Sequence, residues 1–188
     1  MVRFWVWVAA CAVGALAAAM LLFILASLVT GAPAYGAGRG PCDLTLDTGA
    51  RPAFRLAAGD LADLSRTVWA EGRGEPLCGQ VAIAYVAINR AVTNPDAWGS
   101  TVSGVVRRRH QFSVWNTPKQ RARLERIDET DAGYLQAQLA TSLALSGAVA
   151  DPTGGATYFV SARIAPPRWA RRMTALRIGG HVFYRNKD

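Results

Sequence analysis

The sequence predicts an α+β protein: a mainly helical domain with a small β element, preceded by an N-terminal transmembrane helix. Three observations predict it. Residues 4–30 are almost entirely apolar and uncharged, three later segments space their apolar residues as helices do, and two short apolar and aromatic runs near the C-terminus are typical of strands. With 188 residues and 51% hydrophobic content, the chain can form one domain with a sizeable core and an appendage.

The first 30 residues predict a membrane anchor. No charged residue occurs between Arg3 and Arg39, and the apolar run is long enough as a helix to cross the roughly 30 Å hydrocarbon core. A cleavable signal peptide has a shorter apolar region, roughly 7–15 residues long. We therefore expect residues 1–30 to be an uncleaved single-pass anchor in the cytoplasmic membrane, with the folded domain on the periplasmic or extracytoplasmic side. Cleavage near Ala34 would instead give a secreted domain.

Residues 31–58 predict a linker and an irregular lead-in, because they are rich in Gly, Ala and Pro and have no sustained periodicity. The folded domain is therefore expected to cover residues 59–188. Cys42 in the linker and Cys78 in the domain would both lie in a compartment that permits disulfides. A bridge between them is one expectation.

Two helices are predicted at the start of the domain. Asp60 is a suitable N-cap for a helix over residues 61–71, which glycines end. A second helix follows over residues 77–91, since Pro76 suits a first helical turn and apolar side chains cover nearly every face. We expect this second helix to be the buried centre of the domain.

The remaining elements are shorter apart from one helix. In chain order the sequence predicts a turn at 94–96, a short helix at 101–109, an aromatic loop at 111–118, a long helix at 131–146, and strands or extended segments at 156–160 and 181–184. The long helix places four apolar residues on one face: Ala132, Leu135, Leu139 and Leu143. Gly147 is its stop signal.

The net charge of +8 and a pI near 10.1 imply an anionic partner, which could be nucleic acid, a membrane surface or an acidic polymer such as cell wall. Charge alone does not choose among them. The run 107–109 of three arginines could attract anionic wall polymer, although such runs are more often solvated faces. With only His110 and His181 and no HExxH motif, the sequence predicts no catalytic zinc site and no cofactor.

Glu71 and Glu75 are the candidates for acid chemistry. Glu71 continues the apolar stripe of the first predicted helix and ends it, so burial and the negative end of the helix dipole both favour its protonated form. Glu75 lies at the start of the next helix, where the dipole favours the ionised form. Opposite environments for two carboxyl groups are typical of glycoside cleavage. The alternative is structural: Glu71 pairs with Arg66 or Arg73, and Glu75 caps a helix.

Several segments resemble one known family in the same order. The run Trp69-Ala70-Glu71-Gly72-Arg73-Gly74-Glu75-Pro76, with Gly79 to Ala84 and Asn89-Arg90 after it, resembles the opening signature of the SleB/CwlJ-type cell wall hydrolase family, which includes spore-cortex-lytic enzymes. The later segments that resemble the family are Gln111-Phe112-Ser113, Asp151-Pro152-Thr153 with Ala156 and Tyr158, and Ile178 to Tyr184. The resemblance covers residues 61–184.

The resemblance implies a lysozyme-like domain, related to lytic transglycosylases, that cleaves the peptidoglycan strand between N-acetylmuramic acid and N-acetylglucosamine. It implies that Glu71 is the catalytic acid, which then acts as a base so that a 1,6-anhydro product forms. If water attacked instead, a second acid would be needed, and Glu75, Asp96 and Asp151 are the candidates. We expect peptidoglycan as partner, no nucleic acid, and a monomer.

The predicted substrate-binding residues are Glu75, Gln111, Phe112, Ser113 and Tyr158. Phe112 could stack on a sugar ring and Gln111 could bind an acetamido group, while core packing is the alternative for Phe112 and Tyr158.

Other readings of the sequence stay open. Cys78 near a helix N-terminus could be the nucleophile of a wall cysteine peptidase, with His110 or His181 as base. The domain could also be a non-catalytic, membrane-anchored wall-binding protein. Cys11 within the apolar segment, together with Cys42 and Cys78, resembles the arrangement in signal-arrest-release endolysins of phages, so a phage endolysin is a further alternative to a bacterial enzyme.

Overall fold

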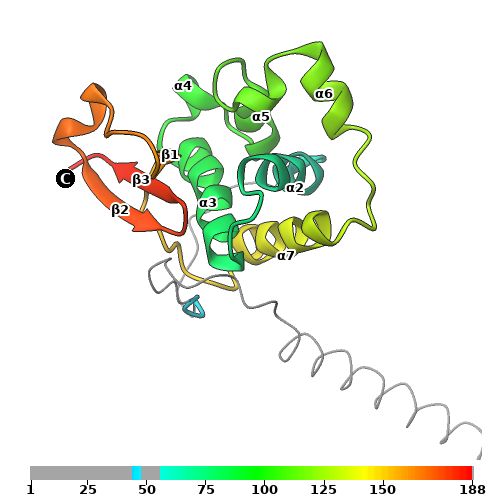
Figure 1. Cartoon of the computed structure of the whole chain (residues 1–188), viewed down its shortest axis with the longest axis horizontal. Helices are drawn as coiled ribbons and strands as arrows, with labels where there is room; N and C mark the ends of the chain where they lie inside the picture. The colour runs from blue at the N-terminus through cyan, green and yellow to red at the C-terminus, as the bar shows by residue number, and fades with distance from the viewer. Residues whose placement is uncertain (1–43, 48–55, 188) are drawn as a thin grey trace, which may run out of the picture. The chain divides into compact units, whose positions relative to one another are not determined.

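The computed structural model describes residues 44–47 and 56–187 (Figure 1). The chain divides into two compact units, residues 1–37 and 38–188, and every described residue belongs to the second. The predicted anchor at 1–30 and most of the linker at 31–58 lie outside the described residues, so both stay predictions. In the described ranges, no helix combines the length and the apolar character that a membrane crossing requires.

The described domain contains helices followed by a small sheet (Figure 1). In chain order the elements are α2 (Asp60–Glu71), α3 (Leu77–Thr93), α4 (Pro95–Trp98), α5 (Val102–Arg107), the 3₁₀ helix η1 (Ser113–Trp115), α6 (Pro118–Leu124), α7 (Ala132–Ser146), β1 (Tyr158–Ser161), the 3₁₀ helix η2 (Arg168–Arg172), β2 (Thr174–Ile178) and β3 (His181–Arg185). This confirms a mainly helical domain with a small β element.

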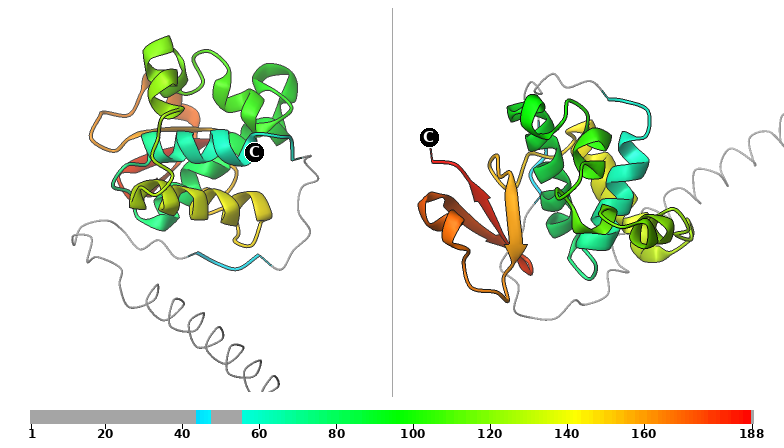
Figure 2. Two further views of the ribbon diagram at one scale, coloured as in Figure 1. Left: turned by 90° about the vertical axis from the view of Figure 1, so that its right-hand side faces the viewer. Right: turned by 90° about the horizontal axis from the view of Figure 1, so that it is seen from above.

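Helix α3 is the centre of the domain, as its apolar sequence predicts. Most of its residues are buried, and it contacts α2, α5, α7 and the sheet. Seen from above, α3 lies between the sheet on one side and α2 on the other (Figure 2). A helix that is apolar on nearly every face is stable only when it is covered in this way.

The sheet has three antiparallel strands in the order β1-β3-β2. Phe183 of β3 is almost fully buried and pairs with Phe159 on one side and Leu176 on the other. The Phe159 and Phe183 rings stack with centroids 5.7 Å apart. This aromatic cross-strand pair lies on the side of the sheet that joins the helical core.

Glu75 links the start of α3 to the turn between β2 and β3. Its side chain is only 6% exposed, and its carboxylate accepts a 2.8 Å hydrogen bond from the backbone N–H of Gly180. His181 Nδ1 lies 3.7 Å from Oε1 of the same carboxylate. Gly179 has a φ of +57°, and a Cβ at that position would collide with the carboxylate. The two glycines of this turn therefore leave the space that Glu75 occupies.

The structure corrects the predicted role of Asp60. Gly59 occupies the N-cap position of α2, and Asp60 is the first residue of the helix. Its buried carboxylate accepts hydrogen bonds from the backbone N–H of Ala57, at 2.8 Å, and of Ser103 in α5, at 2.7 Å. Asp60 therefore joins α2 to α5 instead of capping its own helix.

The structure also corrects the apolar face of α7. Leu135 and Leu139 are 51% and 47% exposed, whereas Ala137 and Ala140 are fully buried. Helix α7 packs against both α2 and α3, and small side chains let helices approach closely. The alanine face therefore turns inward and the two leucines turn outward.

Candidate active site

Glu71 ends helix α2 and lies half-buried at its C-terminus. Burial raises the pKa of this carboxyl group above its ordinary value, because a charged carboxylate loses hydration. Hydrogen bonds from the Ser113 hydroxyl and the Val114 backbone N–H, together with the positive charge of Arg90, act in the opposite direction but do not cancel the effect of burial. The result is a carboxyl group that keeps its proton more readily than an exposed glutamate.

Trp115 holds the loop that brings Ser113 and Val114 to Glu71. Its indole N–H donates a 2.9 Å hydrogen bond to Thr67 Oγ1 on α2, and its ring is almost fully buried. The guanidinium carbon of Arg107 lies 4.4 Å from the centre of that ring. The aromatic loop that the sequence predicts at 111–118 is thus attached to α2 through a buried side chain.

Arg90 is the buried cation of the site. It is 6% exposed, and it donates hydrogen bonds to the carbonyl oxygens of Thr157, at 2.7 Å, and Gln111, at 3.3 Å. Burial lowers its pKa to about 10, while the nearby Tyr158 and Glu71 partly offset that effect. Because it bonds to the loop before η1 and to the segment before β1, Arg90 connects three parts of the chain around Glu71.

Aromatic rings surround the Arg90 guanidinium. Its carbon lies 5.1 Å from the centre of the Phe112 ring, 5.7 Å from that of Tyr158 and 5.9 Å from that of Trp98. Tyr158 in turn contacts Trp98 and the half-exposed Trp169. Cation–π contacts of this kind compensate in part for the lost hydration of a buried arginine.

The structure brings four of the predicted substrate-binding residues to this site, with different roles. Ser113 is exposed and hydrogen-bonds Glu71, and Tyr158 is half-buried beside Arg90. Gln111 gives its backbone carbonyl to Arg90. The Phe112 ring is 2% exposed and packs against Phe159 and Arg90, a position that matches the core-packing alternative and leaves little of the ring for a sugar.

Glu75, the fifth predicted residue, binds the β2–β3 turn as described above. Asp151, a candidate second acid, instead shapes its own loop: its carboxylate accepts hydrogen bonds from the backbone N–H groups of Thr153 and Gly155, both at 2.8 Å, and from the Asn89 amide at 2.9 Å. Asp96 lies exposed in the short helix α4. In the described residues, the one side-chain charge that acts on the Glu71 pKa is that of Arg90.

Cys78 does not have the free thiol that a cysteine peptidase needs. It is disulfide-bonded and buried at the first turn of α3. Cys11 and Cys42 lie outside the described residues. A sulfur in a disulfide is not a thiolate nucleophile, so the peptidase alternative loses its catalytic residue.

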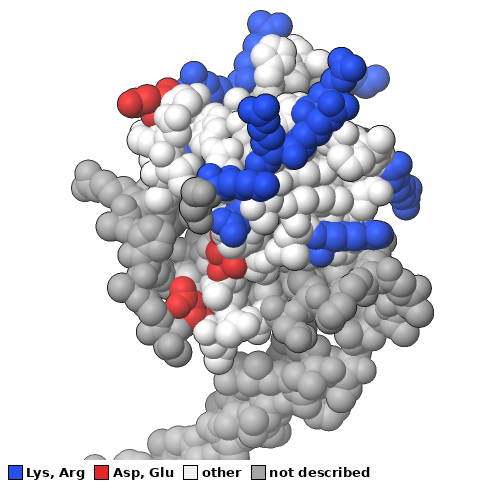
Figure 3. Space-filling view, turned by 90° about the vertical axis from the view of Figure 1, so that its left-hand side faces the viewer, with Lys and Arg blue, Asp and Glu red and all other residues white. Residues whose placement is uncertain are grey.

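The sheet region carries positive charge with no opposing carboxylate side chain of its own. Residues 156–187 contain seven Lys and Arg residues and no Asp or Glu. Lys and Arg side chains dominate the upper part of the face shown in Figure 3. This distribution favours an anionic or polar polymer as the partner of this side of the domain.

Comparisons with known proteins agree with the resemblance in the sequence. The chain matches the family described as Cell Wall Hydrolase over residues 74–184, a range that begins just after Glu71. Among curated relatives, the spore cortex-lytic enzyme of Halalkalibacterium halodurans is 34% identical over 131 residues, which cover 66% of this chain and 34% of the relative. The spore cortex-lytic enzyme of Oceanobacillus iheyensis is 31% identical over 148 residues, or 73% of this chain and 47% of the relative. The chain thus spans between a third and a half of the length of these relatives.

Two solved structures share the fold. The catalytic domain of the Bacillus cereus SleB protein aligns with a TM-score of 0.56 at 27% identity and covers 74% of this chain and 100% of that domain. The catalytic domain of the germination-specific lytic transglycosylase SleB from Bacillus anthracis aligns with a TM-score of 0.55 at 28% identity and covers 69% of this chain and 96% of that domain.

Proposed function

The chain belongs to the cell wall hydrolase family, and from this premise we propose that it cleaves peptidoglycan strands between N-acetylmuramic acid and N-acetylglucosamine, with Glu71 as the catalytic acid. The observation that carries this proposal is the state of Glu71: a half-buried carboxyl group with a raised pKa, held by Ser113 and the Val114 N–H. Such a group can hold a proton at a pH where an exposed glutamate is ionised. The substrate lies outside the cytoplasm, so we expect the domain there too.

The reaction needs one carboxyl group used twice. Protonated Glu71 gives its proton to the glycosidic oxygen while the bond from that oxygen to C1 of the muramic acid unit breaks, which leaves positive charge at the ring. The 6-hydroxyl of the same unit then attacks C1, and the Glu71 carboxylate takes the hydroxyl proton. The products are a new non-reducing end and a 1,6-anhydro ring, and Glu71 is protonated again.

The surroundings of Glu71 support this use of a single acid. A hydrolytic enzyme needs a second carboxylate to activate water or to stabilise the intermediate. Glu75 and Asp151 are already bonded to backbone N–H groups elsewhere, and Asp96 lies exposed on α4. Arg90, not a carboxylate, is the charged side chain next to Glu71 in the described part of the chain.

Product analysis tests the proposal. Purified peptidoglycan digested with the protein should give muropeptides that end in 1,6-anhydro-muramic acid, which mass spectrometry separates from hydrated ends by the mass of one water. Reducing muramic acid ends would mean that water attacks. Free stem peptides with uncleaved glycan would contradict glycan cleavage altogether.

The activity should depend on pH through Glu71. Since the reaction starts from the protonated acid, kcat/KM is expected to be constant at low pH and to fall as the pH rises through the raised pKa of Glu71. The alkaline limb of a pH–rate profile on soluble glycan strands measures this fall in kcat/KM. A limb at the ordinary glutamate value of 4.5 would contradict the assignment, because burial would then have no effect on the reacting acid.

A further inference from the structure

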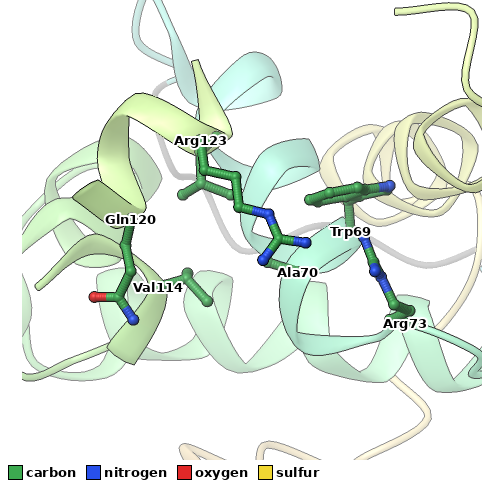
Figure 4. A pocket seen from close by; sticks show the side chains of 7 residues that line it. Trp69, Ala70, Arg73, Val114, Gln120 and Arg123 are labelled. Atoms are coloured by element: carbon green, nitrogen blue, oxygen red, sulfur yellow. The ribbon is translucent and has the colours of Figure 1, made fainter. Parts of the chain in front are cut away.

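A pocket lies beside the loop whose Val114 backbone N–H contacts Glu71. It has a volume of about 240 Å³ and is formed by α2, η1 and α6 (Figure 4). At about 30 Å³ per water molecule, it has room for several waters and therefore for a chemical group larger than a small ion. Its lining residues are Trp69, Ala70, Arg73, Val114, Gln120, Arg123 and Leu124.

Val114 and Ala70 connect this pocket to the proposed acid. Val114 lines the pocket, and its backbone N–H hydrogen-bonds Glu71. Ala70, which precedes Glu71 in α2, lies on the same wall. A substrate unit that places its glycosidic bond at Glu71 therefore has this pocket within reach of its substituents.

The pocket carries two positive charges around one aromatic ring. The guanidinium carbons of Arg73 and Arg123 lie 4.5 Å and 5.9 Å from the centre of the Trp69 ring. Figure 4 shows Arg123 reaching from α6 toward Trp69, with Arg73 next to the same ring. Cations placed on an aromatic face retain attraction for an anion, because the ring does not neutralise them.

Asp131, an acidic residue near Arg73 and Trp69, already has hydrogen-bond donors. Asp131 accepts a 3.0 Å hydrogen bond from the Trp69 indole N–H and a 2.9 Å bond from the Tyr134 backbone N–H. The Trp69 bond is the largest effect that lowers the pKa of Asp131, and the charge of Arg73 is the smallest. Within residues 44–47 and 56–187, neither Arg73 nor Arg123 has a carboxylate within ion-pair distance.

The remaining walls combine apolar surface with one amide. Ala70, Val114 and Leu124 offer aliphatic contacts. Gln120 Oε1 accepts a 2.8 Å hydrogen bond from the Thr117 hydroxyl, and its amide nitrogen lies toward the pocket in Figure 4. The Arg66 side chain holds the end of α6 against α2 through a 3.2 Å hydrogen bond to the Leu124 carbonyl. The pocket thus combines buried or half-buried aliphatic side chains with two exposed arginines.

We propose that this pocket binds the carboxylate-bearing stem peptide that branches from muramic acid, so that the enzyme prefers peptide-substituted strands. The inference rests on the proposed function, since it places the muramic acid unit at Glu71. A stem peptide supplies what the pocket lacks: carboxylates for Arg73 and Arg123, and alanine methyl groups for the aliphatic walls. Muramic acid cyclised to its lactam has neither a peptide nor a carboxylate, and leaves both arginines without a partner.

Three substrates separate the sources of the carboxylate. Strands with intact stem peptides carry peptide carboxylates, strands stripped by an amidase keep only the lactyl carboxylate, and lactam-containing strands carry none. Arg123→Gln removes one charge from the pocket at an exposed position. Arg121→Gln is the matched control, because Arg121 is exposed on the same helix and lies outside the pocket.

Arg123→Gln is expected to raise KM for peptide-bearing strands by about tenfold with little change in kcat, as loss of one charge-assisted contact implies. It should leave stripped and lactam strands unaffected, and Arg121→Gln should change none of the three. An equal rise in KM for stripped strands would assign the pocket to the lactyl carboxylate. An equal rise for all three substrates would mean that Arg123 attracts glycan strands without recognising a particular carboxylate. Either result, or no loss at all, overturns the proposal.

A binding measurement separates this inference from the proposed function. In the Glu71→Gln protein, calorimetric titration with a free stem peptide should show binding that Arg123→Gln weakens by about tenfold. If the unsubstituted protein cleaves no substrate but this peptide binding persists, the proposed reaction fails and the pocket assignment stands. If strands are cleaved and the peptide does not bind, the pocket assignment fails alone.

Discussion

Glu71→Gln is expected to lower kcat for glycan cleavage by about a thousandfold or more. A proton transfer by a positioned side chain contributes about 10²–10⁴-fold to the rate, and the proposed reaction uses Glu71 for two such transfers. The amide keeps the size of the side chain and can still accept hydrogen bonds from Ser113 and Val114, but it cannot give a proton to the glycosidic oxygen. The measurement is the initial rate of muropeptide release from purified peptidoglycan. The matched control is Glu129→Gln, an exposed position in the connection before α7, which should leave the rate unchanged.

The same substitution should stabilise the protein at neutral pH. The raised pKa of Glu71 means that the folded protein keeps a proton that the unfolded chain has already lost, so stability falls as the pH rises through that window. Glutamine has no charge to bury. Denaturation should therefore show equal free energies of unfolding for both proteins below the ordinary glutamate pKa of 4.5, and a more stable variant at pH 7. A less active but also less stable variant at pH 7 would point to a structural role instead.

Arg90→Gln is expected to lower the free energy of unfolding by about 3 kcal/mol, since it leaves the buried Thr157 carbonyl and the half-buried Gln111 carbonyl without their donor, at about 1–3 kcal/mol each. It also removes a cation that contacts three aromatic rings. Urea denaturation followed by circular dichroism gives the difference. Arg126→Gln, at an exposed arginine whose side chain donates a hydrogen bond to the Ala122 carbonyl one turn earlier, is the control and should cost little.

Arg90→Lys tests what Arg90 does for Glu71. Lysine keeps a positive charge near the carboxyl group, but its single ammonium nitrogen lacks the planar fork with which the guanidinium of Arg90 makes both hydrogen bonds. The alkaline limb of the pH–rate profile should move to higher pH in Arg90→Gln, because the charge that lowers the Glu71 pKa is lost, and should stay close to wild type in Arg90→Lys. Identical limbs in all three proteins would exclude an electrostatic role for Arg90.

Local patterns in the sequence predict most of the helices. The spacing of apolar residues places α2, α3 and α7 within a few residues of their observed ends, because each has a strong start or stop signal. Helix α6 was not predicted, since Pro118–Leu124 is mostly charged or polar and buries only Leu124. Strand β2 was missed for a similar reason: Thr174–Ile178 is an edge strand with three exposed residues, and its partner β3 defines it more than its own sequence does.

The site was predictable where one residue carries its own signal. Glu71 is a carboxylate on an apolar stripe, and the structure finds it half-buried with a raised pKa. Arg90 also interrupts an apolar helix, and that pattern would have identified it as a buried cation. The role of Glu75 depends on Gly180, more than 100 residues later, and the orientation of the Phe112 ring depends on Phe159 and Arg90. No local pattern specifies such distant contacts.

The buried hydrogen bond from Trp115 to Thr67 allows one loop to meet two different requirements. The donors to Glu71 must stay fixed within about 0.5 Å, while the neighbouring side chains must be free to change when the wall chemistry changes. Because the indole attaches the loop to Thr67 from inside the core, exposed residues such as Lys119 and Gln120 in the adjoining α6 can vary without moving the acid's partners. New substrate preferences can therefore arise on this surface at little cost to the catalytic geometry.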